Sequence, residues 1–127
     1  MKSRLLTVSV LLAAIWQVPH VLAAPAGAIA MFTAAELPGK CDATLSSAEK
    51  QIAALEKLPL SRVTLQNTLQ AWNRLDIEVQ NLAGPVGLLS EVSPDAEVRK
   101  AAEACELKLS ALFNKTGQSP ALYQRFK

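Results

Sequence analysis

The feature that most constrains the fold is the spacing of large apolar residues after residue 41. These residues recur every three or four positions, the spacing that places side chains on one face of an α-helix. The repeating positions are Leu45, Ala48, Ile52 and Leu55; Leu65, Leu69, Trp72, Leu75, Val79 and Leu82; and Val98, Ala101, Ala102, Cys105, Leu109, Leu112 and Phe113. No run of β-branched residues alternates at the two-residue period of a strand. The sequence therefore predicts an all-α fold, an antiparallel helical bundle or a set of helical hairpins.

Capping and breaking residues predict the ends of the first two helices. Asp42 is expected to cap the first helix, because its carboxylate can accept from the free N–H groups of the first turn. Pro59 is expected to follow its end, since the residue before a proline is pushed out of helical geometry. The second helix is expected to start at Ser61 or Thr64 and to break or kink at Gly84-Pro85.

The third and last helices have stronger start signals. Ser93-Pro94-Asp95 predicts a helix start with Ser93 as the cap, and Gly117 is expected to end that helix in a left-handed conformation. Ser119-Pro120 repeats the start signal close to Lys127. A helix this short needs a partner. We expect that sequence which normally follows is missing; the alternative is a terminal turn packed on the other helices.

The N-terminus has the composition of a secretory signal peptide. Lys2 and Arg4 precede an uncharged run from Leu5 to Trp16, and small residues follow. A basic start, an apolar run of about 7–15 residues and a small-residue site are the parts of such a peptide. Cleavage is expected after Ala23, with Ala30 as a second candidate.

The alternative for this segment is a membrane anchor, which needs about 20 apolar residues. Gln17, Pro19 and His20 interrupt the apolar run and favour the signal peptide. We expect a signal peptide over 1–23, an Ala-, Gly- and Pro-rich linker over 24–40 and a helical domain over 41–127, truncated at its C-terminus. The expected location is periplasmic or secreted, with no stable membrane anchor after cleavage.

Charge and histidine content limit the chemistry. The net charge is +2, which gives no reason to expect a nucleic-acid partner. Cleavage after Ala23 removes Lys2, Arg4 and the sole histidine, His20, and leaves equal numbers of basic and acidic residues. The sequence contains no P-loop, GxGxxG, GxSxG or HExxH motif. We therefore expect no catalytic residue and no metal ligand in this chain.

Cys41 and Cys105 are the only cysteines. In an exported protein a pair is most simply a disulfide. A bridge between them would tie the linker to the helices, and closing so long a loop is worth about 4 kcal/mol by chain entropy. Two buried free thiols or an intermolecular bridge are the alternatives.

Other side chains are interpreted as structural. Trp72 lies on an apolar stripe, so we expect it in the core. Asp76 and Glu78 are two positions apart and point to different helix faces, which disfavours a catalytic pair. Glu103 and Glu106 lie among basic residues, as on an ordinary solvated helix face.

The second half of the chain carries a set of short elements in a specific order. They are Gly84-Pro85 with Leu88, Leu89 and Val92; Arg99 with Ala101; Leu109-Ser110; and Gln118 with Leu122 and Tyr123. With these elements the segment resembles the N-terminal helical region of the thimet oligopeptidase and oligopeptidase A family of zinc metallopeptidases. Ser119 stands where that family more often has Asn.

The resemblance implies a larger protein than this chain. Family members hold zinc with an HExxH helix and a downstream Glu, so zinc is expected only in a full-length member. Their N-terminal helices form part of a wall over a channel that admits short peptides. The implied partners are the catalytic portion of the same peptidase or short peptides, and the exported form resembles periplasmic members from Gram-negative bacteria.

Two functional hypotheses follow. In the first, the chain is the N-terminal segment of an exported zinc oligopeptidase and is inactive alone. In the second, it is a stand-alone exported helical module that binds a peptide or a protein in an apolar groove.

Overall fold

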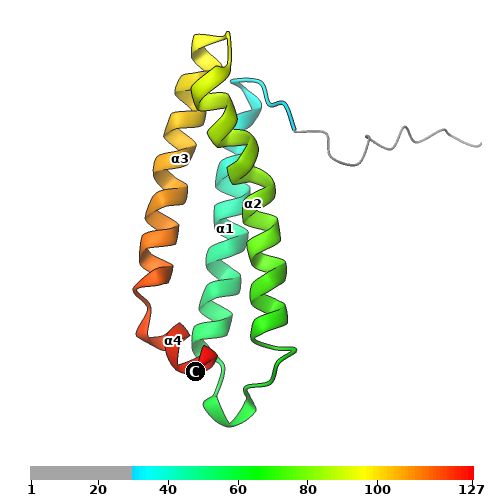
Figure 1. Cartoon of the computed structure of the whole chain (residues 1–127), viewed down its shortest axis with the longest axis vertical. Helices are drawn as coiled ribbons and strands as arrows, with labels where there is room; N and C mark the ends of the chain where they lie inside the picture. Colours follow the sequence, from blue (N-terminus) through cyan, green and yellow to red (C-terminus); the bar gives the residue numbers. More distant parts are fainter. Residues whose placement is uncertain (1–29) are drawn as a thin grey trace, which may run out of the picture.

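The fold consists of helices joined by short connections. A computed structural model describes residues 30–127. Its elements are α1 (Glu36–Lys57), a 3₁₀ turn η1 (Leu60–Arg62), α2 (Leu69–Val92), α3 (Ala96–Gly117) and α4 (Pro120–Phe126). The three long helices lie side by side, each running opposite to the one before it (Figure 1). Residues 30–127 contain helices and no strand, which confirms the all-α prediction for this part of the chain.

Several predictions concern residues outside this range. The signal peptide over 1–23, its cleavage site at Ala23 and the first part of the linker, 24–29, lie outside the described residues. Within the described part, no helix combines the length and the apolar character needed to cross a membrane.

Helix α1 begins earlier than predicted. Thr33 and Glu36 form a capping box: Thr33 Oγ1 accepts from the Glu36 N–H at 3.3 Å, and the Glu36 carboxylate accepts from the Thr33 N–H at 3.0 Å. The prediction of Asp42 as the cap is therefore wrong, and residues 36–40 of the predicted linker are helical. Asp42 lies inside α1, where its carboxylate pairs with Lys108 at 2.6 Å.

The start and the middle of α2 also differ from the prediction. Thr64 and Asn67 cap a turn that leads into the helix, with Thr64 N–H donating to Asn67 Oδ1 at 2.8 Å. The helix itself begins at Leu69. It continues through Pro85, so of the predicted break or kink the break is absent. Val86 and Leu89, just beyond the proline, are buried, and this packing outweighs the hydrogen bond that proline cannot make.

Helix α3 is capped by Asp95 instead of Ser93. The Asp95 carboxylate accepts from the Glu97 N–H at 2.9 Å, while Ser93 Oγ accepts from the Asp95 N–H at 3.3 Å. Gly117 is the last helical residue and does not adopt the predicted left-handed conformation. The short backbone between Ser93 and Asp95 reverses the chain from α2 into α3.

A single core runs between the long helices. Its buried members are Leu37, Cys41, Ala48, Ile52 and Leu55 of α1; Leu75, Val79, Leu82, Val86 and Leu89 of α2; Val98, Ala102, Cys105, Leu109 and Leu112 of α3; and Leu122 of α4. The predicted stripes supply most of this set. Leu65, Leu69 and Phe113 are exceptions, because they are exposed at 57%, 49% and 43%.

A disulfide joins Cys41 to Cys105, with a Cα–Cα distance of 5.9 Å. Both cysteines are buried. Because Cys41 lies within α1, the bridge connects two helices, α1 and α3, and does not tie a linker to the domain as expected from the sequence.

Helix α4 is held against the C-terminal end of α1. Ser119 caps α4 as predicted, accepting from the Leu122 N–H at 3.2 Å, and it donates to the Glu56 carboxylate at 2.6 Å. Arg125 Nε donates to the Leu58 carbonyl at 2.9 Å. These contacts give the seven-residue helix the partner that its length requires.

Candidate binding groove

The most prominent concave feature lies between α2 and α3. The two helices lie close together at residues 93–95, which we call the turn end, and part toward the opposite end, which we call the α4 end (Figure 1). At the α4 end they leave a pocket of about 490 Å³. A second hollow of about 570 Å³ continues toward the turn end and shares Phe113 with the first. Together they form one feature, the α2–α3 groove.

The lining at the α4 end is mostly apolar and aromatic. It consists of Ile52, Leu69, Trp72, Leu75, Asp76, Val79, Leu112, Phe113, Thr116, Gly117, Ser119, Leu122, Tyr123 and Phe126. The rings of Trp72 and Phe126 meet edge to face, with centroids 5.4 Å apart and an interplanar angle of 72°. Leu69, Phe113 and Tyr123 leave much of their apolar surface open to solvent.

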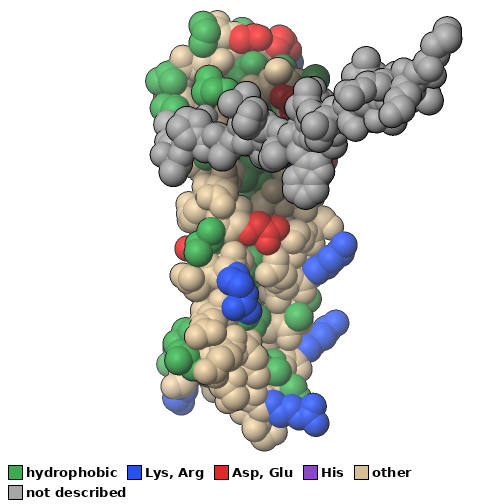
Figure 2. Space-filling model, turned by 90° about the vertical axis from the view of Figure 1, so that its right-hand side faces the viewer, with side chains coloured by type: hydrophobic (Ala, Val, Ile, Leu, Met, Phe, Trp, Pro, Cys, Tyr) green, Lys and Arg blue, Asp and Glu red, His purple; other side chains and the backbone are tan. Residues whose placement is uncertain are grey.

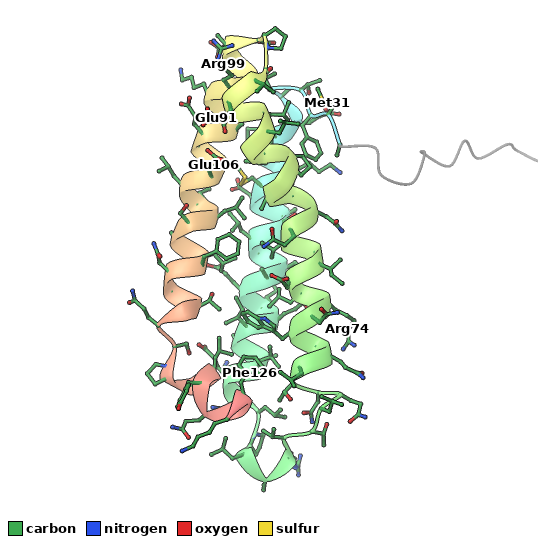
Figure 3. All side chains as sticks on the ribbon, in the orientation of Figure 1. Met31, Arg74, Glu91, Arg99, Glu106 and Phe126 are labelled. Atoms are coloured by element: carbon green, nitrogen blue, oxygen red, sulfur yellow. A yellow bond between two sulfur atoms is a disulfide. The ribbon has the colours of Figure 1, made fainter. Side chains whose placement is uncertain are left out.

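The lining toward the turn end is more polar. It consists of Ala83, Glu103, Glu106, Leu107, Leu109, Ser110 and Phe113. Glu106 of α3 lies against α2, where its Oε1 is 3.3 Å from the position that a Cβ on Gly87 would take. The absence of a side chain at Gly87 therefore makes room for this carboxylate, which Figure 3 places between the two helices.

The charged residues of the groove all have the same sign. Asp76, Glu103 and Glu106 line it, and no Lys or Arg does. Within residues 30–127 the ion pair found is Lys108–Asp42, so none of the three groove carboxylates is paired there. Arg74 extends from α2 away from the groove (Figure 3). The groove therefore combines an apolar pocket with unpaired negative charge.

One carboxyl group elsewhere has a shifted pKa. Hydrogen bonds from the Thr33 backbone and side chain lower the pKa of Glu36 below its ordinary value of 4.5. Glu36 is fully exposed at the start of α1, so this shift reflects helix capping and not a reactive site.

The site residues named from the sequence do not form a reactive centre. Cys41 and Cys105 are buried in the disulfide, and Ala23 lies outside the described residues. In residues 30–127 no three His, Cys, Asp or Glu side chains gather closely enough to hold a metal ion. These residues therefore do not fit a zinc site, and we derive no zinc-dependent step from them.

Sequence reasoning missed the groove. Trp72, assigned to the core, is partly buried against it and also lines the pocket at the α4 end. Glu103 and Glu106, assigned to a solvated face, line the second hollow. A signal was present in α3, since Glu103, Glu106, Ser110, Phe113 and Gly117 recur at helical spacing beside the buried stripe. A second stripe of this kind indicates a second contact surface.

A comparison with known proteins finds a weak similarity to one oligopeptidase. A thimet-like oligopeptidase from Dictyostelium discoideum is 28% identical over 78 residues, which cover 61% of this chain. The match spans 12% of that relative. No family model and no solved structure matches. The similarity agrees in part with the resemblance found from the short motifs, and it reaches only a small part of an oligopeptidase.

Proposed function

We propose that this chain is a helical segment of an exported zinc oligopeptidase. In that protein it would cover the catalytic portion and wall the channel through which short peptides enter. The observation that carries this proposal is the 28% identity over 78 residues with a thimet-like oligopeptidase. The zinc site would lie outside residues 30–127, because these residues hold no suitable group of ligands.

The shape of the protein is consistent with the proposed function as a channel wall. Helix α2 has 24 residues and is therefore about 36 Å long. Three long helices packed around one core can line one side of a channel. Leu69, Phe113 and Tyr123 are exposed at the α4 end, and this open apolar surface is typical of a face that another polypeptide covers.

The disulfide supports export. A buried bridge between α1 and α3 forms and persists in oxidising compartments such as the periplasm. The basic and apolar N-terminus supplies a signal for that route, with cleavage proposed after Ala23.

The first test reads the DNA that follows codon 127. We expect it to encode further helical sequence and an HExxH motif, in the same or an adjacent reading frame. A locus without any HExxH reading frame would contradict the proposal.

The second test measures peptide cleavage by the downstream polypeptide. Expressed with this chain, it is expected to cleave short fluorogenic peptides and to leave a folded protein intact. Expressed without the chain, it should become insoluble or lose its size selectivity, because apolar surface and the channel are exposed. Equal solubility, rate and selectivity in both preparations would exclude a wall function.

The groove favours a second candidate function. Its open apolar pocket of about 490 Å³ also suits a stand-alone exported module that binds a peptide or a protein. That function predicts that the downstream polypeptide is unaffected by the chain, while the chain alone unfolds cooperatively and binds its partner.

A further inference from the structure

We propose that the α2–α3 groove binds a cationic amphipathic helix. Only the source of that helix rests on the proposed function, in which the peptidase portion supplies the helix. The groove itself fixes the chemistry, through its shape, its apolar surface and its charge.

The shape of the groove suits a helix. Helices α2 and α3 flank it and α1 lies behind it, so an added helix would lie alongside three others (Figure 1). Ala83 and Ser110 line the hollow toward the turn end and are small, which lets a helix backbone approach closely there. Amphipathic helices bind in this way, with their apolar face in an apolar groove.

The apolar end of the groove defines where large side chains would lie. Trp72 and Phe126 form part of the pocket lining, and Phe113 and Leu69 stand at its open side, each more than two-fifths exposed. Burying these exposed side chains would remove apolar surface from water, the dominant favourable term in association. Leucine-sized residues of the incoming helix would occupy this pocket.

The charge of the groove selects cations. Asp76, Glu103 and Glu106 are the charged residues of its lining, and none has an ion-pair partner in the described part of the chain. Lys or Arg of the incoming helix would meet these carboxylates, whereas Asp or Glu would face repulsion. Repulsion between like charges weakens the binding of an acidic helix, so the groove is expected to prefer a basic helix.

The charged residues along the groove orient the bound helix. Figure 2, which faces the outer side of α2, shows basic side chains in the lower half of the molecule and acidic ones in the middle and upper part. Lys115 and Lys127 lie near the α4 end outside the groove. The cationic part of the helix is therefore expected beside Glu103 and Glu106, and its apolar part in the pocket over Trp72.

The experiment uses a synthetic helical peptide with a Leu-rich half and a Lys-rich half, labelled with fluorescein. Binding to the purified protein is followed by fluorescence anisotropy. We expect a Kd below about 100 μM at low salt, weakening as salt is added. The control peptide has Glu at every Lys position and is expected to bind at least about tenfold more weakly.

Variants of the protein locate the site. Glu106→Gln is expected to weaken binding of the Lys peptide up to about fivefold, the usual range for an exposed ion pair. Glu49→Gln, an exposed carboxylate on α1 outside the groove, is the matched control and should leave binding unchanged. Phe113→Ala should weaken binding of the same peptide more than Leu60→Ala, which alters an exposed residue outside the groove.

Three results would each overturn the inference: no binding up to about 1 mM, equal binding of the Lys and Glu peptides, or equal effects of Glu106→Gln and Glu49→Gln. Circular dichroism of each variant shows that it is folded before binding is measured. These results leave the peptidase proposal intact, because that proposal is tested by the downstream DNA and by peptide cleavage. Conversely, a locus without a peptidase would change the source of the helix and not its chemistry.

Discussion

The turn end and the α4 end of the molecule are packed differently. At the turn end, the most completely buried large side chains of the described residues gather, namely Leu37, Leu89, Val86 and Cys41. At the α4 end, α2 and α3 part, and Leu69, Phe113 and Tyr123 stay exposed around a pocket. Val92 and Met31, near the turn end, are exposed as well, so the two ends differ in the apolar pocket at the α4 end and not in exposed apolar surface as a whole.

The difference teaches how a chain this small can present an apolar groove and still fold. A domain of about 100 residues has only about 5–10 kcal/mol of net stability. The disulfide and the tight packing lie at the turn end, while α4 closes the other end through polar contacts of Ser119 and Arg125. The packing at the turn end therefore does not depend on the apolar surface that lines the pocket at the α4 end.

The largest expected effect comes from removing the disulfide. Replacing Cys41 and Cys105 together with alanine frees a loop with a sequence separation of 64 residues. Chain entropy then predicts a loss of about 4 kcal/mol in the free energy of unfolding. Urea unfolding followed by circular dichroism measures it. A loss below about 1 kcal/mol would mean that packing alone holds the turn end together.

The next effect compares two leucines on α3. Leu109 is 3% exposed and Leu107 is 74% exposed. Leu109→Ala should cost about 2–5 kcal/mol, because it leaves a cavity between the helices. Leu107→Ala should stay within about 0.5 kcal/mol of the original protein. Urea unfolding of the two variants checks this, and equal losses would contradict the burial of only one face of α3.

Most of the fold follows from the spacing of apolar residues. Val98, Ala102, Cys105, Leu109 and Leu112 were assigned to the buried face of α3 from sequence and are buried. An apolar stripe at this spacing packs against partner helices, so this part of the fold depends on local pattern. The same pattern also predicted burial of Phe113, which is wrong, because the helices part where it lies.

Helix ends and the groove depend on information that spacing does not carry. Pro85 lies inside α2 because tertiary packing outweighs the local preference of proline. Helix α1 begins at the Thr33–Glu36 capping box; this motif is present in the sequence, but Asp42 was predicted as the cap. The groove depends on the divergence of α2 and α3, which no local motif encodes. In the sequence, the groove was indicated only by the helical spacing that places Glu103 and Glu106 on the same face of α3 as Phe113.

A smaller effect tests how α4 is attached. Ser119→Ala removes the cap of α4 and its hydrogen bond to Glu56, and should cost about 1 kcal/mol. The edge-to-face contact of Trp72 with Phe126 should loosen with it, changing the Trp72 fluorescence at denaturant concentrations below global unfolding. Ser61→Ala, in the α1–α2 connection, serves as the control. If Trp72 fluorescence changes equally in both variants, α4 does not depend on this cap.

The smallest effect is a dependence on pH confined to the turn end. The pKa of Glu36 is lowered in the folded protein by its hydrogen bonds with Thr33. Its stabilising contribution is therefore fully present above the ordinary value of 4.5 and is lost as the pH falls through the folded value.

Glu36→Gln should remove this part of the acid sensitivity, while the control Glu49→Gln should keep it. Amide hydrogen exchange reports where the change occurs. On acidification, and after correction for the intrinsic exchange rate, the first turn of α1 should lose protection relative to the same turn in Glu36→Gln. The first turn of α4 should show no such difference, because Glu36 does not contact its cap, Ser119, and both proteins keep the Glu56 carboxylate to which Ser119 donates. A difference of equal size in both turns would mean that the two ends of the molecule open together. The two ends would then differ in packing but not in local unfolding.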